Sequence, residues 1–353
     1  MIADIRLQNF RSYKDATFEF GSNVNIIVGP NASGKTNLLE AILTICQGSS
    51  YKAKDLEMIM HQKPWARIDA RVDNGARSVK LQTEPNGAVR KSFELGGQKF
   101  ARLSLAKTVP AVLFEPEHLQ LLTGAPELRR DYLDNLLART VSGYDKTRRD
   151  YRRTLSQRNA LLKRGNLPAT NQLFAWNVRL SELGGQLATE RARLVKELNS
   201  SAQAIYKKLA SSKAEVALSY SSAIPTKNYS SSLLHKLEAS QQLDMARGFT
   251  GHGPHRDDLK VELAGHEAQA TASRGEARTL ILMLKILELK LLEAEWNKKP
   301  ILLLDDVFSE LDGKRRQALT KFLKDYQTFI TTTDADVVVR HFIDKATIIP
   351  TSK

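Results

Sequence analysis

Eight residues near the N-terminus have the types and spacing of a phosphate-binding loop. The segment GPNASGKT, Gly29 to Thr36, follows the β-branched run VNIIV and precedes the apolar run NLLEAILTI. Glycines let backbone N–H groups turn toward an anion, lysine supplies a charge for β- and γ-phosphates, and the final hydroxyl can bind Mg²⁺. This strand–loop–helix context predicts an ATP–Mg²⁺ site that includes Gly29, Pro30, Asn31, Ala32, Ser33, Gly34, Lys35, Thr36 and Asn37.

Two carboxylates end a second apolar run, ILLLDD, from Ile301 to Asp306. We predict that Asp305 is a magnesium ligand and that Asp306 polarises the attacking water. Alone, the run could be a buried strand that ends in a solvated turn, but with the upstream loop it indicates a P-loop ATPase. The following SELD predicts a helix-capping turn, with Ser309 or Asp312 as the cap.

A third segment, ASRGEARTL from Ala272 to Leu280, starts an apolar helical run a few dozen residues before Asp305. Its simplest interpretation is a capping box of Ser273 and Glu276. It also resembles the signature loop of ABC-type ATPases, whose Ser and Gly face the γ-phosphate of ATP held by the other subunit. Both interpretations can hold, because a capped helix N-terminus presents N–H donors to an anion. We therefore expect Ser273 and Gly275 to act with Lys35 and Asp306 in catalysis.

The elements around these motifs predict an α/β fold with a helical insertion. Alternating or β-branched runs over roughly the first 115 residues predict strands with one early helix, and similar signals return after Phe249. Between them, apolar residues recur at spacings of three and four, and KRGNLPAT separates two helical stretches. We expect an ABC-type ATP-binding head of mixed β-sheet and flanking helices over 1–115 and 249–353, split by an α-helical arm over 116–248.

Composition restricts the classes of partner and compartment. The chain has 353 residues, 53 Lys and Arg against 39 Asp and Glu, a net charge of +14, and a single cysteine, Cys46. The charge favours a polyanionic partner such as nucleic acid, although a basic solvated surface is the alternative. One cysteine permits no internal disulfide and no zinc cluster, which suits a reducing cytoplasm. No apolar run approaches the length of a membrane helix, so we expect no membrane partner.

The helical stretch Asp145 to Arg164 is rich in cations. Seven of them fall on one helical arc roughly 160° wide at 100° per residue. They are Lys146, Arg148, Arg149, Arg152, Arg153, Lys163 and Arg164. Only Asp145 and Asp150 within the run offset them, so the arc could contact DNA phosphates or could be a solvated face. Without a base-reading pattern, any duplex binding should be independent of sequence.

The whole chain resembles the RecF family of recombination-repair ATPases, relatives of Rad50 and SMC heads without their long coiled coil. The resemblance rests on LQNFRSY at Leu7–Tyr13, the motifs above and the short arm. It also rests on two more discriminating stretches, Pro116–Asp134 and GHGPHRDDL at Gly251–Leu259. It implies action at single-/double-strand DNA junctions, an ATP-dependent homodimer, and RecO and RecR as partners in loading RecA. Within LQNFRSY, we assign Arg11 to nucleotide binding.

The two discriminating stretches also have plainer interpretations. His255, Asp257 and Asp258 invite a metal site, but one such cluster is poor evidence, and we expect a structural ion pair between Arg256 and Asp257. An ordinary helix with i,i+4 charge pairs would account for ELRRDYLD. The family pattern instead suggests that Arg129 and Arg130 join head and arm or contact DNA.

Three features depart from the family or from ABC ATPases in general. Arg274 stands where the signature loop usually has Gln, and Asp306 stands where many ABC ATPases have Glu, which is compatible with slow hydrolysis. Where a switch histidine often follows, this chain has Thr332, Thr333 and Asp334. An SMC-like tether, an ATPase-coupled nuclease and a transporter ATPase are alternatives. The short arm, the lack of residues for a metal-carboxylate domain, and the basic arm with the RecF motifs argue against them in turn.

Overall fold

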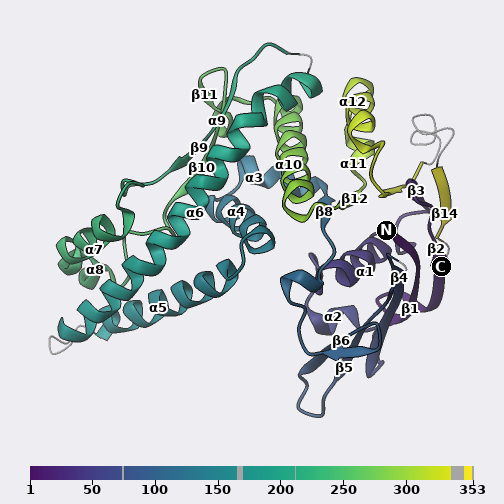
Figure 1. The fold of residues 1–353 in the computed structure, drawn as a ribbon, viewed down its shortest axis with the longest axis horizontal. Coiled ribbons are helices and arrows are strands. Elements are labelled where there is room, and N and C mark those ends of the chain that lie inside the picture. The colour runs from purple at the N-terminus through teal and green to yellow at the C-terminus, as the bar shows by residue number, and fades with distance from the viewer. Residues whose placement is uncertain (74, 165–169, 211, 335–345, 352–353) are drawn as a thin grey trace. The chain divides into compact units, whose positions relative to one another are not determined.

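The computed structural model describes every residue except 74, 165–169, 211, 335–345 and 352–353 (Figure 1). Contacts divide the chain into two compact units, one of Met1–His118 with Glu288–Lys353 and one of Leu119–Leu287. The fold is the expected ABC-type α/β head with helical segments. Among the residues described, no helix is long and apolar enough to cross a membrane.

The first unit contains two sheets. A six-stranded antiparallel sheet has the order β2-β1-β4-β5-β6-β7. Its strands are β1 (Ile2–Phe10), β2 (Tyr13–Glu19), β4 (Trp65–Val72), β5 (Gly75–Thr83), β6 (Val89–Leu95) and β7 (Gln98–Phe100). A five-stranded parallel sheet has the order β14-β3-β13-β12-β8. Its strands are β3 (Val24–Val28), β8 (Ala111–Phe114), β12 (Ile301–Asp305), β13 (Thr328–Thr332) and β14 (Ala346–Pro350).

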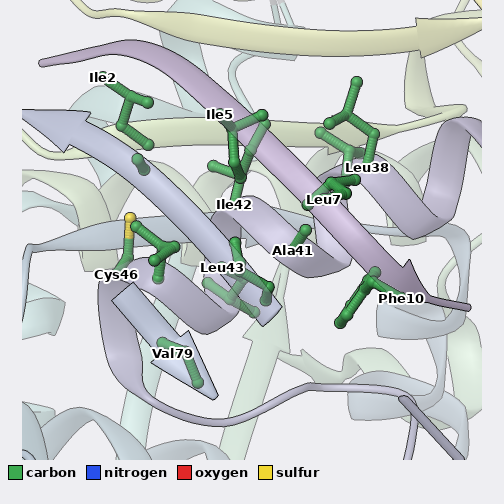
Figure 2. Packing of buried hydrophobic residues seen from close by; sticks show 14 of the residues in the cluster. Ile2, Ile5, Leu7, Phe10, Leu38, Ala41, Ile42, Leu43, Cys46 and Val79 are labelled. Atoms are coloured by element: carbon green, nitrogen blue, oxygen red, sulfur yellow. The ribbon is translucent and has the colours of Figure 1, made fainter. Parts of the chain in front are cut away.

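Helix α1 (Lys35–Gln47) packs against strands of both sheets. This explains why NLLEAILTIC is mostly apolar: all residues from Leu38 to Cys46 are buried. Figure 2 shows Leu38, Ile42 and Cys46 of α1 in one buried hydrophobic cluster with Ile5 of β1 and Val79 of β5. The phosphate-binding loop therefore leads into a helix whose whole surface is fixed by packing.

Short helices complete the first unit. They are α2 (Asp55–Met58), the 3₁₀ turn η1 (Leu105–Lys107), α11 (Val307–Glu310) and α12 (Gly313–Leu323), and the turn η2 (Pro116–Leu119) lies at the end of its first segment. The predicted cap of α12 is Asp312, whose carboxylate accepts a hydrogen bond from the Arg315 N–H at 2.9 Å. The side chain of Ser309 lies outside the described residues.

The second unit is mostly helical. Its helices are α3 (Gln120–Thr123), α4 (Pro126–Thr140), α5 (Tyr144–Arg164), α6 (Thr170–Ala210), α7 (Tyr229–Ala239), α8 (Gln241–Arg247), α9 (Ala268–Thr271) and α10 (Arg274–Trp296) as far as Leu287. A three-stranded sheet of order β11-β10-β9 accompanies them, with β9 (Val216–Ser221), β10 (Asp258–Leu263) and β11 (His266–Glu267).

Helices α5 and α6 form the predicted hairpin. They pack side by side (Figure 1). Arg158 donates to Asn177, whereas Thr147, earlier on α5, donates to Gln186, later on α6. The two helices therefore run antiparallel. The predicted linker between them includes 165–169, which lie outside the described residues.

We expected a boundary between residues 248 and 249, but the second compact unit extends to Leu287. Residues 249–287 group with the helical segment, because β10 pairs along its whole length with β9 and packs against α4. Strand β9 lies inside a stretch that we expected to be helical. The sequence of β9, VALSYS, alternates over only six residues. Such a short pattern does not distinguish a strand from part of a helix unless the partner strand is known.

Candidate nucleotide and signature-loop sites

The parallel sheet brings the predicted nucleotide-binding residues together. β13 lies between β3, which ends at the phosphate-binding loop, and β12, which ends at Asp305. The register pairs Thr331 with Asp305 and Thr332 with Val28. Because parallel strands end at the same edge, the loop, Thr331 and both aspartates gather there, which is where open α/β sheets bind ligands.

Three hydroxyl groups hold the carboxylate of Asp305. Thr36 Oγ1 and Thr331 Oγ1 both donate to Asp305 Oδ1, at 3.1 and 2.8 Å. Tyr51 OH donates to Asp305 Oδ2 at 3.1 Å. Asp305 is 7% exposed, so these donors offset the cost of burying its charge.

The Lys35 side chain folds back onto its own phosphate-binding loop. Its Nζ donates to the carbonyls of Gly29 at 2.7 Å and Pro30 at 2.8 Å. Burial lowers the pKa of Lys35, while the nearby carboxylates of Asp306 and Asp305 act in the opposite direction. A lysine ammonium that donates to carbonyls can move to a phosphate, which offers a stronger, charge-assisted bond.

Two glycines of the loop allow close approach of neighbouring groups. Gly34 has φ of 99°, and a Cβ there would lie 2.8 Å from Tyr13 OH, which donates to the Gly34 carbonyl at 3.1 Å. A Cβ on Gly29 would lie 2.5 Å from the Thr351 carbonyl. The loop is also fixed by a 2.8 Å hydrogen bond between Ser33 and Thr351. Replacement of either glycine would therefore displace the loop.

The remaining loop residues are arranged differently. Pro30, Asn31 and Ala32 are exposed, and Ala32 has φ of 63°. Asn37, on the first turn of α1, donates to Ser12 Oγ at 2.9 Å.

The donor set fits a magnesium ion. The Thr36 hydroxyl and the Asp305 carboxylate are hard oxygen ligands, and their oxygens lie 3.1 Å apart. Mg²⁺ is usually bound by one or two protein oxygens with water and substrate phosphates, and this pair is such a set. Both predicted magnesium ligands thus lie together at the loop.

Asp306 has an unusual backbone conformation. Its φ of 54° and ψ of 16° are left-handed, and its N–H donates to Thr331 Oγ1 at 2.9 Å. Such a conformation is uncommon outside glycine and is strained unless the surroundings impose it. It separates the two aspartates: Asp305 is buried among hydroxyls, whereas Asp306 is exposed.

Arg11 lies beside α1 and not on the loop itself. Its Nε donates to the buried carboxylate of Glu40 at 2.7 Å, and its Nη1 donates to the Glu57 carbonyl at 3.1 Å. The guanidinium is a quarter exposed. The structure therefore gives Arg11 a partner on α1, and its predicted contact with nucleotide stays a prediction.

In the second unit, Ser273 caps α10 as predicted. Ser273 Oγ accepts from the Glu276 N–H at 3.3 Å, and Glu276 Oε2 accepts from the Ser273 N–H at 2.9 Å. Ser273 Oγ also donates to Glu276 Oε2 at 2.7 Å. Ser273 and Arg274 are exposed, and the Gly275 carbonyl accepts from Thr279 at 2.9 Å. This capping box leaves an exposed helix N-terminus, so both interpretations of the segment still hold.

Acidic side chains from α4 neutralise part of the basic arc. Arg152 pairs with Asp131 at 3.0 Å, and Arg148, 18% exposed, lies 3.9 Å from Asp134. Arg149 pairs with Asp145 on its own helix. Asp145 and Asp150 within the run are therefore not the whole of the offset, because the neighbouring helix α4 adds Asp131 and Asp134. Lys146, Arg153, Lys163 and Arg164 are exposed.

The segment Gly251–Leu259 holds a buried polar cluster. The Asp257 carboxylate accepts hydrogen bonds from Tyr220 at 2.7 Å, Ser222 at 2.7 Å and Tyr229 at 2.8 Å. Burial raises its pKa. The expected ion pair with Arg256 is wrong: the Arg256 guanidinium lies 5.2 Å from the Phe249 ring centroid, and three hydroxyls satisfy Asp257.

Arg129 and Arg130 make contacts within the second unit. Arg129 forms two hydrogen bonds with Asp258, and Arg130 Nη1 donates to the Asp257 carbonyl at 3.0 Å. Among the described residues there is no group of three or more His, Cys, Asp or Glu that could hold a metal ion.

Sequence reasoning missed Tyr51, Thr331 and the Arg129–Asp258 pair. Tyr51 lies in a loop without a motif, and Thr331 lies one residue before the positions considered for a switch. Arg129 and Asp258 are 129 positions apart, one in each of the two discriminating stretches. The sequence could have indicated their contact only if the two stretches had been expected to pack together. Thr332 and Asp334 hydrogen-bond each other, and Thr333 is exposed.

Comparison with known proteins agrees with these motifs. Residues 1–348 match the family model of the RecF/RecN/SMC N terminal domain. The DNA replication and repair protein RecF of Acetivibrio thermocellus is 33% identical over 356 residues, covering 94% of this chain and 93% of that protein. The same-named protein of Heliobacterium modesticaldum is 36% identical over 343 residues, with 94% and 92% covered.

Solved structures give the same relationship. The recombination mediator protein RecF-ATPrS in the RecFOR pathway matches with a TM-score of 0.84 and 31% identity, over 95% of this chain and 92% of that one. RecF-ATP in the same pathway matches with a TM-score of 0.82 and 31% identity, over 94% and 92%. An SMC head bound to the C-winged helix domain of ScpA, 16% identical with a TM-score of 0.56, shares the fold over 100% and 94%. The chain therefore belongs to the RecF family of DNA replication and repair proteins.

Proposed function

We propose that this protein is an ATP-controlled DNA clamp of recombinational repair. The observation that carries the proposal is the hydrogen bond from Thr36 to Asp305, which joins the phosphate-binding loop to the end of β12. That pair provides the oxygen ligands for Mg²⁺, whose charge offsets that of the nucleotide phosphates. Two relatives in the family are described as RecF bound to ATP or ATPrS.

Each residue then has a distinct role. Lys35 leaves the Gly29 and Pro30 carbonyls for the β- and γ-phosphates, and the loop N–H groups bind the same anion. Asp306, which is exposed beside Asp305, orients the attacking water and accepts its proton in slow hydrolysis.

The exposed N-terminus of α10 supplies the second half of the site. Ser273 and Gly275 of one copy close on the γ-phosphate of ATP held by another copy, so ATP favours a homodimer. Dimerisation places basic surface on duplex DNA, and hydrolysis releases it. Duplex DNA, single-/double-strand junctions and the proteins RecO, RecR and RecA are the partners that family membership suggests. The two structural relatives with nucleotide are RecF proteins of the RecFOR pathway.

A substitution in the signature loop tests this arrangement. Ser273→Arg should leave ATP affinity near normal, because it leaves the P-loop intact, but should abolish the ATP-dependent dimer measured by sedimentation. As a simple cap, Ser273 would contribute only about 1 kcal/mol to stability. An ATP-dependent dimer of wild-type strength in Ser273→Arg would overturn the trans arrangement.

Complementation makes the test specific. A mixture of Ser273→Arg with Lys35→Ala contains one dimer in which ATP on the first chain faces the intact Ser273 loop of the second. That mixture should regain part of the ATPase activity that each variant lacks alone. Lys14→Ala, an exposed lysine of β2, is the matched control for Lys35→Ala.

A further inference from the structure

The corner formed by α3, Gly124, Ala125 and α4 contacts three elements around the signature loop. At its centre is Arg129, whose side chain is 6% exposed. Arg129 Nε and Nη2 donate to the two carboxylate oxygens of Asp258, at 2.8 and 2.7 Å. Arg129 Nη1 donates to the carbonyls of Leu121 at 3.3 Å and Gly124 at 3.0 Å. All three guanidinium nitrogens are thus used, in a planar fork that fixes direction as well as charge.

Asp258 is the first residue of the strand that leads to Ser273. From Asp258 the chain passes through β10, the antiparallel partner β11 and the short helix α9, and then reaches Ser273. Helix α3 packs against α9, and α4 packs against β10. Arg129 therefore ties together the end of α3 and the start of β10, the two elements that position the approach to the loop.

The same corner also contacts the helix that follows the loop. Tyr132, one turn after Arg129, donates from its hydroxyl to the Leu284 carbonyl of α10 at 3.0 Å. The Lys285 ammonium lies 5.8 Å from the centroid of the Tyr132 ring. The corner thus holds the chain both before and after Ser273. The capping box of Ser273 and Glu276 fixes the loop only locally.

We propose that Arg129 is a positioning residue for the trans-acting signature loop, with Asp258 as its partner and Tyr132 as a second attachment. The inference rests on the proposed function, in which Ser273 acts on ATP of another copy. A buried ion pair is weak evidence for stability alone, because desolvation offsets most of its Coulomb energy. The bidentate geometry instead restricts the orientation of β10 and α3. A displacement on the order of 1 Å at a catalytic group can reduce a rate by about 100-fold.

Arg129→Lys is the variant that tests orientation with little change in charge. Lysine can pair with Asp258, but it cannot form two parallel hydrogen bonds and also reach the Leu121 and Gly124 carbonyls. ATP affinity of the monomer, measured by calorimetry, should be unchanged. The ATP-dependent dimer and kcat should fall on the order of tenfold or more. Arg139→Lys, on the same helix, should behave as wild type in both measurements.

Complementation distinguishes positioning of the loop from a general structural role. Mixed with Lys35→Ala, Arg129→Lys should regain ATPase activity, because its ATP then faces a loop supported by an intact Arg129. If that mixture stays inactive while the Ser273→Arg mixture recovers, this inference fails and the proposed function stands. If neither mixture recovers, the trans arrangement fails and the inference fails with it.

A gentler substitution covers the case in which Arg129→Lys does not fold. Tyr132→Phe removes only the hydroxyl that binds the Leu284 carbonyl, and it should weaken the ATP-dependent dimer several-fold while it leaves ATP affinity unchanged. Mixing Tyr132→Phe with Lys35→Ala should restore ATPase activity, as expected for Arg129→Lys. Wild-type dimerisation in Tyr132→Phe, or in a folded Arg129→Lys, would overturn the inference.

Discussion

His255 is a partly buried side chain whose contacts indicate its tautomer. Tyr151 OH lies 2.7 Å from His255 Nδ1, and His255 Nε2 lies 3.1 Å from the Thr250 carbonyl. A carbonyl can only accept, so Nε2 carries the proton and Nδ1 accepts from Tyr151. Burial lowers the pKa of His255 from 6.5 to about 4, with Arg256 acting in the same direction. The folded protein therefore keeps this imidazole neutral at pH 5.

Stability should fall as the pH drops through this window. Between pH 6.5 and about 4, His255 binds a proton in the unfolded chain but not in the folded one, so the free energy of unfolding decreases. From pH 7 to pH 5, His255 should account for at most about 2 kcal/mol of that decrease, measured by urea denaturation. The contribution is fully present above pH 6.5.

His255→Gln should remove this part of the pH dependence, whereas His235→Gln, on an exposed position of α7, should keep it. Burial raises the pKa of Asp257, which acts in the opposite direction, but both proteins share it and it cancels in the comparison. If the free energy of unfolding fell equally from pH 7 to pH 5 in wild type and in His255→Gln, the lowered pKa of His255 would be contradicted.

Single residues show how far the sequence alone could go. The roles expected of Lys35, Thr36 and Asp305 follow from contiguous motifs, because strand, loop and helix are local. Tyr51 and Thr331, which hold the Asp305 carboxylate, could not be predicted, because their contacts depend on which strands are neighbours and in what register. The partner of Asp257 was predicted wrongly for the same reason: its hydroxyl donors come from β9 and the chain beyond it.

Helix α5 shows the same limit for a complete element. Periodicity predicted the helix, its apolar stripe and its antiparallel partner, but not the acids that α4 places beside its cations. Along α5 lies a hollow of about 420 Å³ lined by Arg152, Leu155, Ser156, Asn159, Ala160 and Lys163.

Because Arg148, Arg149 and Arg152 have carboxylate partners, Arg153, Lys163 and Arg164 are the better candidates for DNA phosphates.

Replacement of Arg153, Lys163 and Arg164 by Ala should weaken duplex binding. Each lost phosphate contact should reduce the slope of log affinity against log salt by about 0.9. Fluorescence anisotropy with a gapped duplex at several salt concentrations measures the slope. The matched control is replacement of Lys196, Lys207 and Lys208 on α6 by Ala. These lysines are exposed, and their replacement removes the same charge. Equal slopes for both triple variants would mean that α5 is a solvated face.

In the whole molecule, the candidate site residues are divided between the two compact units. The P-loop, Asp305 and Asp306 belong to the first, and Ser273 and the corner around Arg129 belong to the second. The expected division assigned Ser273 to the ATP-binding head, because 249–287 has strand and helix signals like those of the head. Sequence periodicity cannot reveal that β10 pairs with β9 instead of joining the sheets of the first unit.

In the proposed function, Asp306 determines how long the ATP-dependent dimer lasts. Asp306→Asn keeps the size of the side chain but cannot accept a proton from water, so hydrolysis should slow by about 100-fold or more, while ATP still binds through Lys35 and Thr36. In the proposed function hydrolysis opens the clamp, so sedimentation with ATP and DNA should show a dimer that outlasts that of the wild type. Asp325→Asn, exposed after α12, should change neither property. Wild-type turnover in Asp306→Asn would remove this residue from the mechanism. Slow turnover with wild-type dissociation would show instead that the dimer opens without hydrolysis, so that ATP binding alone would govern how long two copies stay on DNA.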